Sequence, residues 1–279
     1  MTEPVTVLGL GPMGHAIADA FVAAGHQTTV WNRSTTRPTP DGAVRADLTS
    51  AVAASKIVVV CLLDYDAVRA VLDPIAATLR GRLVVNVTSG SPDAARATAE
   101  WAAGHGIDYV DGAIMTPTNT IGTADAVLLL SGKVETDALS ALGGTQTYLG
   151  TDPGRAAAYD VALLDIFWTS VVGVAHAFAL ARSEHITPSE LAPLARGIAT
   201  LMPIVIDEHG ARLEEGRHGG DYSNLRSAAA GMAHIIHTAR ARGIDAGVME
   251  AAHALTQGAI DAGHGDDGIS RLTVALESA

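Results

Sequence analysis

A long, largely apolar stretch of the chain runs from Ala156 to Ala181, and it contains no Gly or Pro before Gly173. Most of its residues favour helix, so the pattern predicts one helix of 26 residues. Such a helix is roughly 40 Å long. Because apolar side chains occur almost all round it, we expect the helix to be buried, covered by other helices or by a second subunit.

Before this helix, short apolar runs of strand length alternate with helix patterns. The expected strands are Val5–Leu8, Thr28–Trp31, Ile57–Leu62, Leu83–Val87, Tyr109–Asp111, Ala126–Ser131 and Thr147–Leu149. Helices are expected after Gly14, over Asp66–Leu79 and over Asp93–Gly104. This alternation predicts an α/β domain with a parallel, doubly wound sheet of the Rossmann type.

After the long helix the chain carries only helical patterns. They cover Pro188–Ala199, Met202–Glu214, Leu225–Arg242, Gly247–Ala262 and Ile269–Glu277. We therefore expect a Rossmann domain over 1–153, a long interdomain helix over 154–182 and an all-α domain over 183–279. A helical domain this small covers a long apolar helix poorly by itself, which favours a homodimer with interlocked helical domains.

Charge and composition narrow the range of partners. The formal net charge is −12, which argues against nucleic-acid binding, because phosphates require a basic patch. The long helix would also suit a membrane span by length, but Asp160 and Asp165 would cost several kcal/mol at membrane depth, so no membrane partner is expected. One cysteine excludes an internal disulfide, and without a signal-peptide pattern we expect a cytoplasmic protein.

A glycine-rich motif joins the first strand to the first helix. Its residues are Gly9, Leu10, Gly11, Pro12, Met13 and Gly14, the pattern G-x-G-x-x-G. Gly9 permits a tight turn, Gly11 lets the backbone approach a pyrophosphate, and Gly14 lets helix and strand pack closely. The helix N-terminus then faces the anion. This context predicts dinucleotide binding.

The end of the second strand indicates which dinucleotide. An NAD-preferring site places Asp or Glu there to bind the ribose 2′-hydroxyl. This chain instead has two arginines, two hydroxyl residues and an amide: Asn32, Arg33, Ser34, Thr35 and Arg37. Arginine binds phosphate through paired hydrogen bonds, so the loop favours the 2′-phosphate of NADPH.

Ligands of a doubly wound sheet bind at the carboxyl ends of its strands. The residues expected there around the cofactor are Cys61, Leu62, Leu63, Thr88 and Ser89. Met115 and Thr116, after the next strand, are expected beside the substrate. The two hydroxyls of Thr88 and Ser89 are suited to donate to the nicotinamide or a substrate, or to serve simple turn chemistry.

Taken together, the motifs GLGPMG, VWNRS, VNVTSG, DGAIMT and AAYDVALL resemble the NADPH-dependent imine reductases, within the group of 3-hydroxyacid dehydrogenases. The resemblance covers nearly the whole chain. It implies a Rossmann domain, a long interdomain helix and a domain-swapped helical dimer. It also implies an active site between one subunit's cofactor domain and its partner's helical domain, with a small imine as substrate.

Asp160 is the expected catalytic residue. The 3-hydroxyacid dehydrogenases have a Lys in a G-x-x-x-x-x-K arrangement, and here Asp160 follows Gly154 by six residues. A lysine would repel an iminium cation, whereas an anionic carboxylate stabilises it. At an effective dielectric near 20, a carboxylate about 4 Å from a unit positive charge gains roughly 4 kcal/mol.

Further pocket residues come from the resemblance and from helix geometry. Trp168 lies eight residues after Asp160, about 80° round the helix, and is expected to form a pocket wall. Met232 and Tyr222 are also expected to line the pocket. His234 and His237 share a helix face, but two histidines are too few for a metal site, so no metal is expected.

Two other functions remain open from the sequence. A hydroxyacid dehydrogenase is disfavoured by the missing lysine, and a non-catalytic NADPH sensor would need only the dinucleotide loop. Consumption of NADPH with cyclic imines, compared with hydroxyacids, discriminates these functions from imine reduction.

The basic loop gives a first prediction. Arg33→Ala should raise the Michaelis constant for NADPH far more than that for NADH, because only NADPH carries the 2′-phosphate. Steady-state kinetics with both cofactors measure the difference. An equal, small effect on both would contradict a 2′-phosphate site in this loop.

Overall fold

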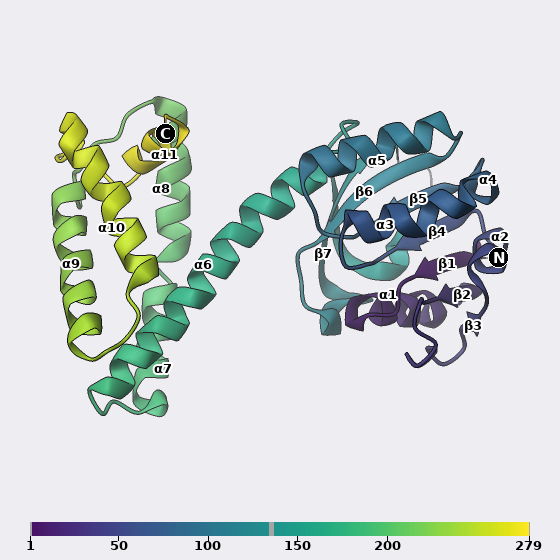
Figure 1. The fold of residues 1–279 in the computed structure, drawn as a ribbon, viewed down its shortest axis with the longest axis horizontal. Helices are drawn as coiled ribbons and strands as arrows, with labels where there is room; N and C mark the ends of the chain where they lie inside the picture. Colours follow the sequence, from purple (N-terminus) through teal and green to yellow (C-terminus); the bar gives the residue numbers. More distant parts are fainter. Residues whose placement is uncertain (1, 134–136, 279) are drawn as a thin grey trace. The chain divides into compact units, whose positions relative to one another are not determined.

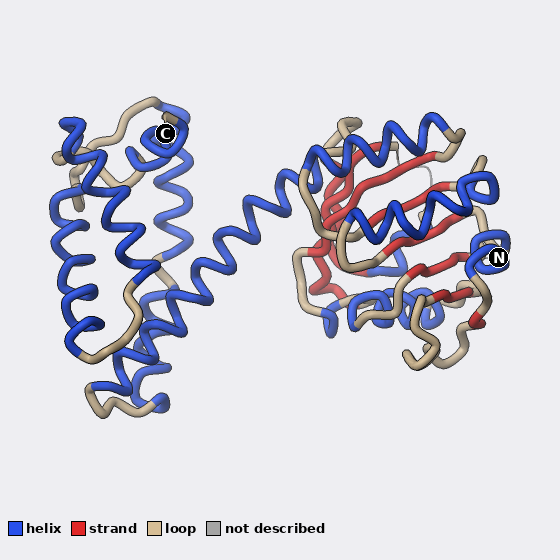
Figure 2. The backbone as a smooth tube through the Cα atoms, viewed as in Figure 1, coloured by secondary structure: helices blue, strands red, loops and turns tan. Residues whose placement is uncertain are grey.

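A computed structural model of the chain describes residues 2–133 and 137–278. Its contacts divide the chain into two compact units, Met1–Phe167 and Trp168–Ala279, so the division falls inside the long helix. Figures 1 and 2 show an α/β first unit and a helical second unit. The expected fold class is therefore confirmed.

The first unit contains one eight-stranded sheet in the order β3-β2-β1-β4-β5-β6-β7-β8. The strands are β1 Val5–Leu8, β2 Thr28–Trp31, β3 Val44–Arg45, β4 Ile57–Val60, β5 Leu83–Asn86, β6 Asp108–Ile114, β7 Thr123–Gly132 and β8 Gly143–Tyr148. All neighbouring pairs are parallel except β6 and β7, which are antiparallel. The sheet is thus parallel, as expected, except between β6 and β7, which are joined without a crossover helix.

Helices cover both faces of this sheet (Figure 1). They are α1 Pro12–Ala23, α2 Leu48–Ala53, α3 Tyr65–Leu72, α4 Ala76–Leu79 and α5 Pro92–Gly104, with 3₁₀ turns η1 Asp73–Ile75, η2 Thr118–Thr120 and η3 Ala138–Leu142. Alternate residues of the strands pack against α1 on one face and against α2 to α5 on the other. This two-sided burial explains the continuous apolar runs of β1 and β4, whose residues are all buried.

The long helix α6 extends over Arg155–Ser183, slightly further than the sequence predicts. The helices of the second unit are α7 Pro188–Ala199, α8 Met202–Glu215, α9 Leu225–Ala241, α10 Gly247–Ala259 and α11 Arg271–Glu277, with a wide turn η4 at Ile260–His264. A capping box between Thr187 and Glu190 begins α7.

Many large apolar side chains of α6 are exposed within one chain. Phe167 is 54% exposed and Trp168 is 58% exposed, and large apolar side chains of α7 and α8 are exposed as well. By length and composition, the segments Arg155–Ser183 and Pro188–Glu215 would suffice to cross a membrane, with mean hydropathies of 1.7 and 1.3. From the sequence we expect α6 to be buried either by other helices or by a second subunit. The helices of its own chain leave much of α6 exposed.

Candidate active site

The glycine loop after β1 has the geometry that its three glycines predict. Gly9 has a φ of +103°, which side-chain-bearing residues rarely adopt. A Cβ at Gly14 would lie 2.1 Å from the carbonyl oxygen of Gly9, so only glycine lets α1 pack this closely on the loop. A Cβ at Gly11 would meet no atom within 4 Å, which leaves open space at the N-terminus of α1 for an approaching phosphate.

Asn32 connects the glycine loop to the basic loop after β2. Its Oδ1 accepts a hydrogen bond from the backbone N–H of Leu10 (2.9 Å), and its Nδ2 donates to the carbonyl of Ser34 (2.9 Å). The side chains of Arg33, Ser34, Thr35 and Arg37 are exposed at this edge. Asn32 therefore connects the two loops through hydrogen bonds. The guanidinium groups of Arg33 and Arg37 remain accessible to an anion.

The end of β4 lies next to the glycine loop, and the end of β5 lies beside that of β4. The backbone N–H of Leu62 donates to the hydroxyl oxygen of Thr88 (3.0 Å), and Thr88 is buried. Burial raises the pKa of the Cys61 thiol to about 11, so this side chain is neutral, and its carbonyl would lie 2.1 Å from a Cβ at Gly9. Leu63, the next residue, is 87% exposed.

The start of α6 is held firmly against this edge of the sheet. Arg96 donates to both carboxylate oxygens of Asp152 (3.1 and 2.9 Å), just before the helix begins. The Ser131 hydroxyl of β7 donates to the carbonyl of Pro153 and accepts from the N–H of Ala156 (both 3.0 Å). A Cβ at Gly154 would lie 2.8 Å from both the Arg96 guanidinium and the Pro92 carbonyl oxygen, so this close approach requires glycine.

Asp160 lies in the second turn of α6 and is 2% exposed. Burial raises the pKa of its carboxyl, while a hydrogen bond donated by the Ser89 hydroxyl opposes that rise. Ser89 follows β5, so the structure brings together two residues that are far apart in the sequence and were expected at one site. Because the carboxyl is buried, Asp160 is not simply a solvated acid that stabilises the dipole of the helix start.

Met115 and Thr116 follow β6 in the same unit. Met115 packs against a small cluster formed by Ala113, Leu129 and Ala156. The Thr116 hydroxyl oxygen accepts from the N–H of Val127 (3.2 Å), which fixes the turn into β7. Met115 therefore lies beside the first turn of α6, as a pocket residue near Asp160 requires.

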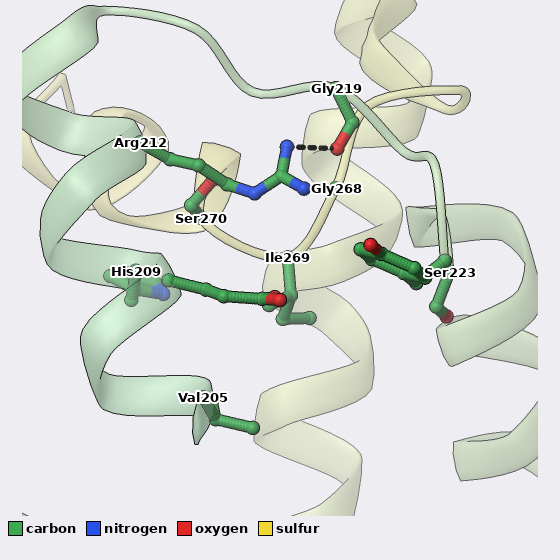
Figure 3. Close-up of a pocket in the computed structure, with 10 residues that line it drawn as sticks. Val205, His209, Arg212, Gly219, Ser223, Gly268, Ile269 and Ser270 are labelled. Carbon is green, nitrogen blue, oxygen red and sulfur yellow. Dashed lines mark hydrogen bonds between the residues drawn. The ribbon is translucent and has the colours of Figure 1, made fainter. Parts of the chain in front are cut away.

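Trp168, Tyr222 and Met232 belong to the second unit, so their place in a pocket around Asp160 remains a prediction. Tyr222 lines a cavity of about 230 Å³ within that unit, together with His209, Arg212 and Ser270. Figure 3 shows Arg212 of α8 reaching the carbonyl of Gly219, a hydrogen bond of 2.6 Å. Met232 is half-buried, and its sulfur accepts from the Thr256 hydroxyl (3.8 Å).

The sequence did not single out a second buried carboxyl near this site. Asp111 of β6 is 1% exposed, and the charge of Asp160 acts on it. The sequence offered little signal, because Asp111 stands at the end of the expected strand Tyr109–Asp111 and β6 contains a second acidic residue, Asp108. Among the described residues, no group of three or more His, Cys, Asp or Glu side chains is arranged to hold a metal ion.

Two family models match the two parts of the chain. Residues 4–138 match the NAD binding domain of 6-phosphogluconate dehydrogenase. Residues 152–278 match the C-terminal domain of NADPH-dependent reductive aminase-like proteins. The second match begins where α6 docks on the sheet and includes Asp160.

The chain is 32% identical to the NADPH-dependent reductive aminase of Aspergillus oryzae, over 98% of this chain and 96% of that protein. This chain belongs to the imine reductase and reductive aminase family. An imine reductase from Myxococcus stipitatus, solved with NADP⁺, is 36% identical with a TM-score of 0.93. That match covers 98% of this chain and 99% of the other. A reductive aminase from Aspergillus terreus, solved with NADPH4, cyclohexanone and allyl amine, is 33% identical with a TM-score of 0.93. That match covers 99% of this chain and 100% of the other.

Membership of the family confirms the resemblance on which the sequence analysis relied. The chain is an oxidoreductase of the imine reductase family. The glycine loop, the exposed arginines and the buried carboxyl on α6 are the features of the first unit that fit a dinucleotide and a cationic reacting group.

The glycine loop generates a prediction with its own matched control. Gly14→Ala should lower the free energy of unfolding by about 1–3 kcal/mol, because its methyl group overlaps the backbone of Gly9. Gly11→Ala should leave stability unchanged and weaken NADPH binding, because its methyl group enters the space open to the pyrophosphate. Thermal denaturation and fluorescence titration with NADPH measure the two effects. The same loss of stability in both variants would contradict the separate roles of the two glycines.

Proposed function

We propose that this protein uses NADPH to reduce imines, cyclic imines included, to amines. The observation that supports this most is the buried carboxyl of Asp160, on a helix that begins directly after the docked Gly154 turn. In the reaction the imine nitrogen takes one proton, and the iminium carbon then takes one hydride, so that an amine and NADP⁺ result. NADPH supplies that hydride when it is bound.

The carboxylate of Asp160 is suited to stabilise the iminium cation electrostatically. A carboxylate removed from water interacts strongly with a nearby cation, because little solvent screens it. The hydrogen bond from Ser89 orients the carboxylate and favours its charged form. The raised pKa of Asp160 also suits it to hold a proton for the imine nitrogen, and water supplies the net proton.

The residues at the carboxyl ends of the strands fit NADPH. The open space at Gly11 suits the pyrophosphate, and Arg33 and Arg37 suit the 2′-phosphate. Relatives have been solved in complex with NADP⁺, with NADPH4, cyclohexanone and allyl amine, and with NADPH4 and dibenz[c,e]azepine. We infer that the substrates of this chain are likewise small carbonyl-derived imines.

We further propose that the protein is a homodimer. Exposed apolar side chains follow one another along α6, α7 and α8, more densely than on an ordinary surface. They include Phe167, Trp168, Val171, Val172, Leu194, Ile198, Leu201, Ile204 and Ile206. A second copy of the chain would bury this surface and bring its helical domain to the pocket around Asp160. The carboxylates of Asp160 and Asp165 on the same helix argue against a lipid membrane as the surroundings of these apolar side chains.

The catalytic role of Asp160 predicts that its replacement lowers imine reduction without lowering NADPH binding. In Asp160→Asn and Asp160→Ala, kcat/KM for a cyclic imine should fall about 100-fold or more, because no anion then faces the iminium. The Kd for NADPH should change little, since Asp160 is not part of the glycine or basic loop. A spectrophotometric assay with a 2-methylpyrroline-type imine and a fluorescence titration measure the two quantities.

Near-wild-type turnover by both variants would exclude a catalytic Asp160. Turnover of 3-hydroxyisobutyrate but of no imine by the wild type would favour the hydroxyacid dehydrogenase function. Tight NADPH binding without turnover of either substrate class would favour a sensor.

The dimer predicts a change of mass in solution. Ile198→Glu places a charge in the apolar surface of α7, where the side chain is 69% exposed in one chain, and should convert the dimer to a monomer. Val44→Glu is the matched control, because Val44 is similarly exposed (65%) and belongs to β3, outside the apolar surface of α6, α7 and α8. Analytical ultracentrifugation distinguishes the two states. A monomeric wild type at micromolar concentration would refute the dimer.

A further inference from the structure

A network of buried polar side chains surrounds Asp111 behind the Asp160 site. Its Oδ1 accepts hydrogen bonds from the hydroxyls of Tyr65 (2.5 Å) and Tyr109 (2.8 Å). The Asn86 amide donates to the Tyr109 hydroxyl (3.0 Å). The other oxygen, Oδ2, is buried and has no hydrogen-bond partner among the described residues. A buried carboxylate oxygen without a donor is costly, so the environment favours the protonated acid.

Tyr65 connects this network to both elements that hold Asp160. Its side chain packs against Ala157, three residues before Asp160 on α6. Its ring also lies against Gly90, where a Cβ would come within 2.3 Å of a ring carbon. Gly90 follows Ser89, whose hydroxyl donates to the Asp160 carboxylate. One tyrosine therefore contacts Asp111, the Ser89–Gly90 turn and the start of α6.

The charges of the two carboxyls act on each other. Burial raises the pKa of Asp111 to about 7, and the charge of Asp160 contributes to the rise, while the hydrogen bonds from Tyr65, Tyr109 and Asn86 oppose it. The titratable groups that face Asp111 are Tyr65 from α3, Tyr109 from its own strand and Asp160 from α6. Its register partners Asn86 on β5 and Ser131 on β7 carry no charge.

Within this network, Asp111 is the group whose charge changes near neutral pH. Burial raises the pKa of both tyrosines above their ordinary value, so they remain neutral donors. Asp160 has a raised pKa as well. Two carboxyls so coupled lose their protons in two steps that belong to the pair.

We propose that Asp111 is a positioning residue for imine reduction, whose change of charge sets how strongly the Asp160 site attracts a cationic iminium. This inference rests on the proposed function of Asp160. With Asp111 protonated, a single carboxylate acts on the cation. With Asp111 ionised, two carboxylates act on it, and attraction for the cation increases.

A cation of fixed charge tests this directly. The probe is N,N-dimethylpyrrolidinium, whose size resembles a cyclic iminium and whose charge does not depend on pH. Its Kd for the protein saturated with NADP⁺ is measured by calorimetry from about pH 4, near the ordinary pKa of an aspartate, to about pH 9. In the wild type we expect affinity to rise in two steps, the upper one by at least about threefold.

Three variants test whether the upper step in cation affinity comes from the ionisation of Asp111. Asp111→Asn keeps the shape of the side chain without its titration and should abolish the upper step. Tyr65→Phe removes a donor to Asp111 and should move the upper step to higher pH, because the ionised form loses a hydrogen bond. Asp66→Asn is the control, because it removes an exposed carboxylate next to Tyr65 and should leave both steps unchanged.

An upper step that persists in Asp111→Asn overturns the inference. If that variant does not fold, an upper step that Tyr65→Phe leaves at the wild-type pH overturns it equally. A third outcome separates the two proposals: the wild type binds the cation without an upper step, and Asp160→Asn weakens the binding. That outcome overturns this inference and supports the proposed function. No binding of the cation by the wild type at any pH overturns both.

Discussion

The structure depends on keeping an acidic side chain inside the protein at the start of α6. Removing a carboxylate from water costs free energy that a surface site would not incur. The docking of α6 provides the rigidity that this requires, through the Arg96–Asp152 ion pair and the Ser131 hydrogen bonds on either side of the helix start. The same scarcity of water that makes Asp160 costly makes its attraction for a cation strong.

The topology of the sheet explains why the relevant residues meet. The strand order reverses between β1 and β4, and the loops after these strands diverge to leave a crevice at their carboxyl ends. The glycine loop, the Cys61–Leu63 turn and the Ser89 turn all follow strands of this edge. The helix α6 returns to the same region because β7 is antiparallel to β6 and its Ser131 binds the helix start.

The sequence predicted those parts of the fold that local patterns determine. Runs of Val and Ile predicted β1, β4 and β5, and the length of α6 followed from an uninterrupted helix pattern. The two-residue strand β3 and the six-residue helix α2 are too short for any period to show, and the sequence missed both. Asp160 was singled out because an aspartate stands where the 3-hydroxyacid dehydrogenases have a lysine, whereas Asp111 looked like an ordinary strand residue. Its hydrogen bond with Tyr65 of α3 and its pairing with Asn86 of β5 arise only in the folded protein, so the sequence does not show them.

The identity of residue 160 also determines the state of its buried neighbour. A lysine at this position would favour the ionised form of Asp111 and pair with it, so the two charges would cancel. An aspartate has the opposite effect, because two nearby carboxyls compete for protons and one of them keeps a proton to higher pH. Replacing lysine by aspartate therefore changes more than one charge: it converts a neutral pair into a pair whose total negative charge varies with pH. A reaction that passes through a cation is the chemistry for which such a pair is useful.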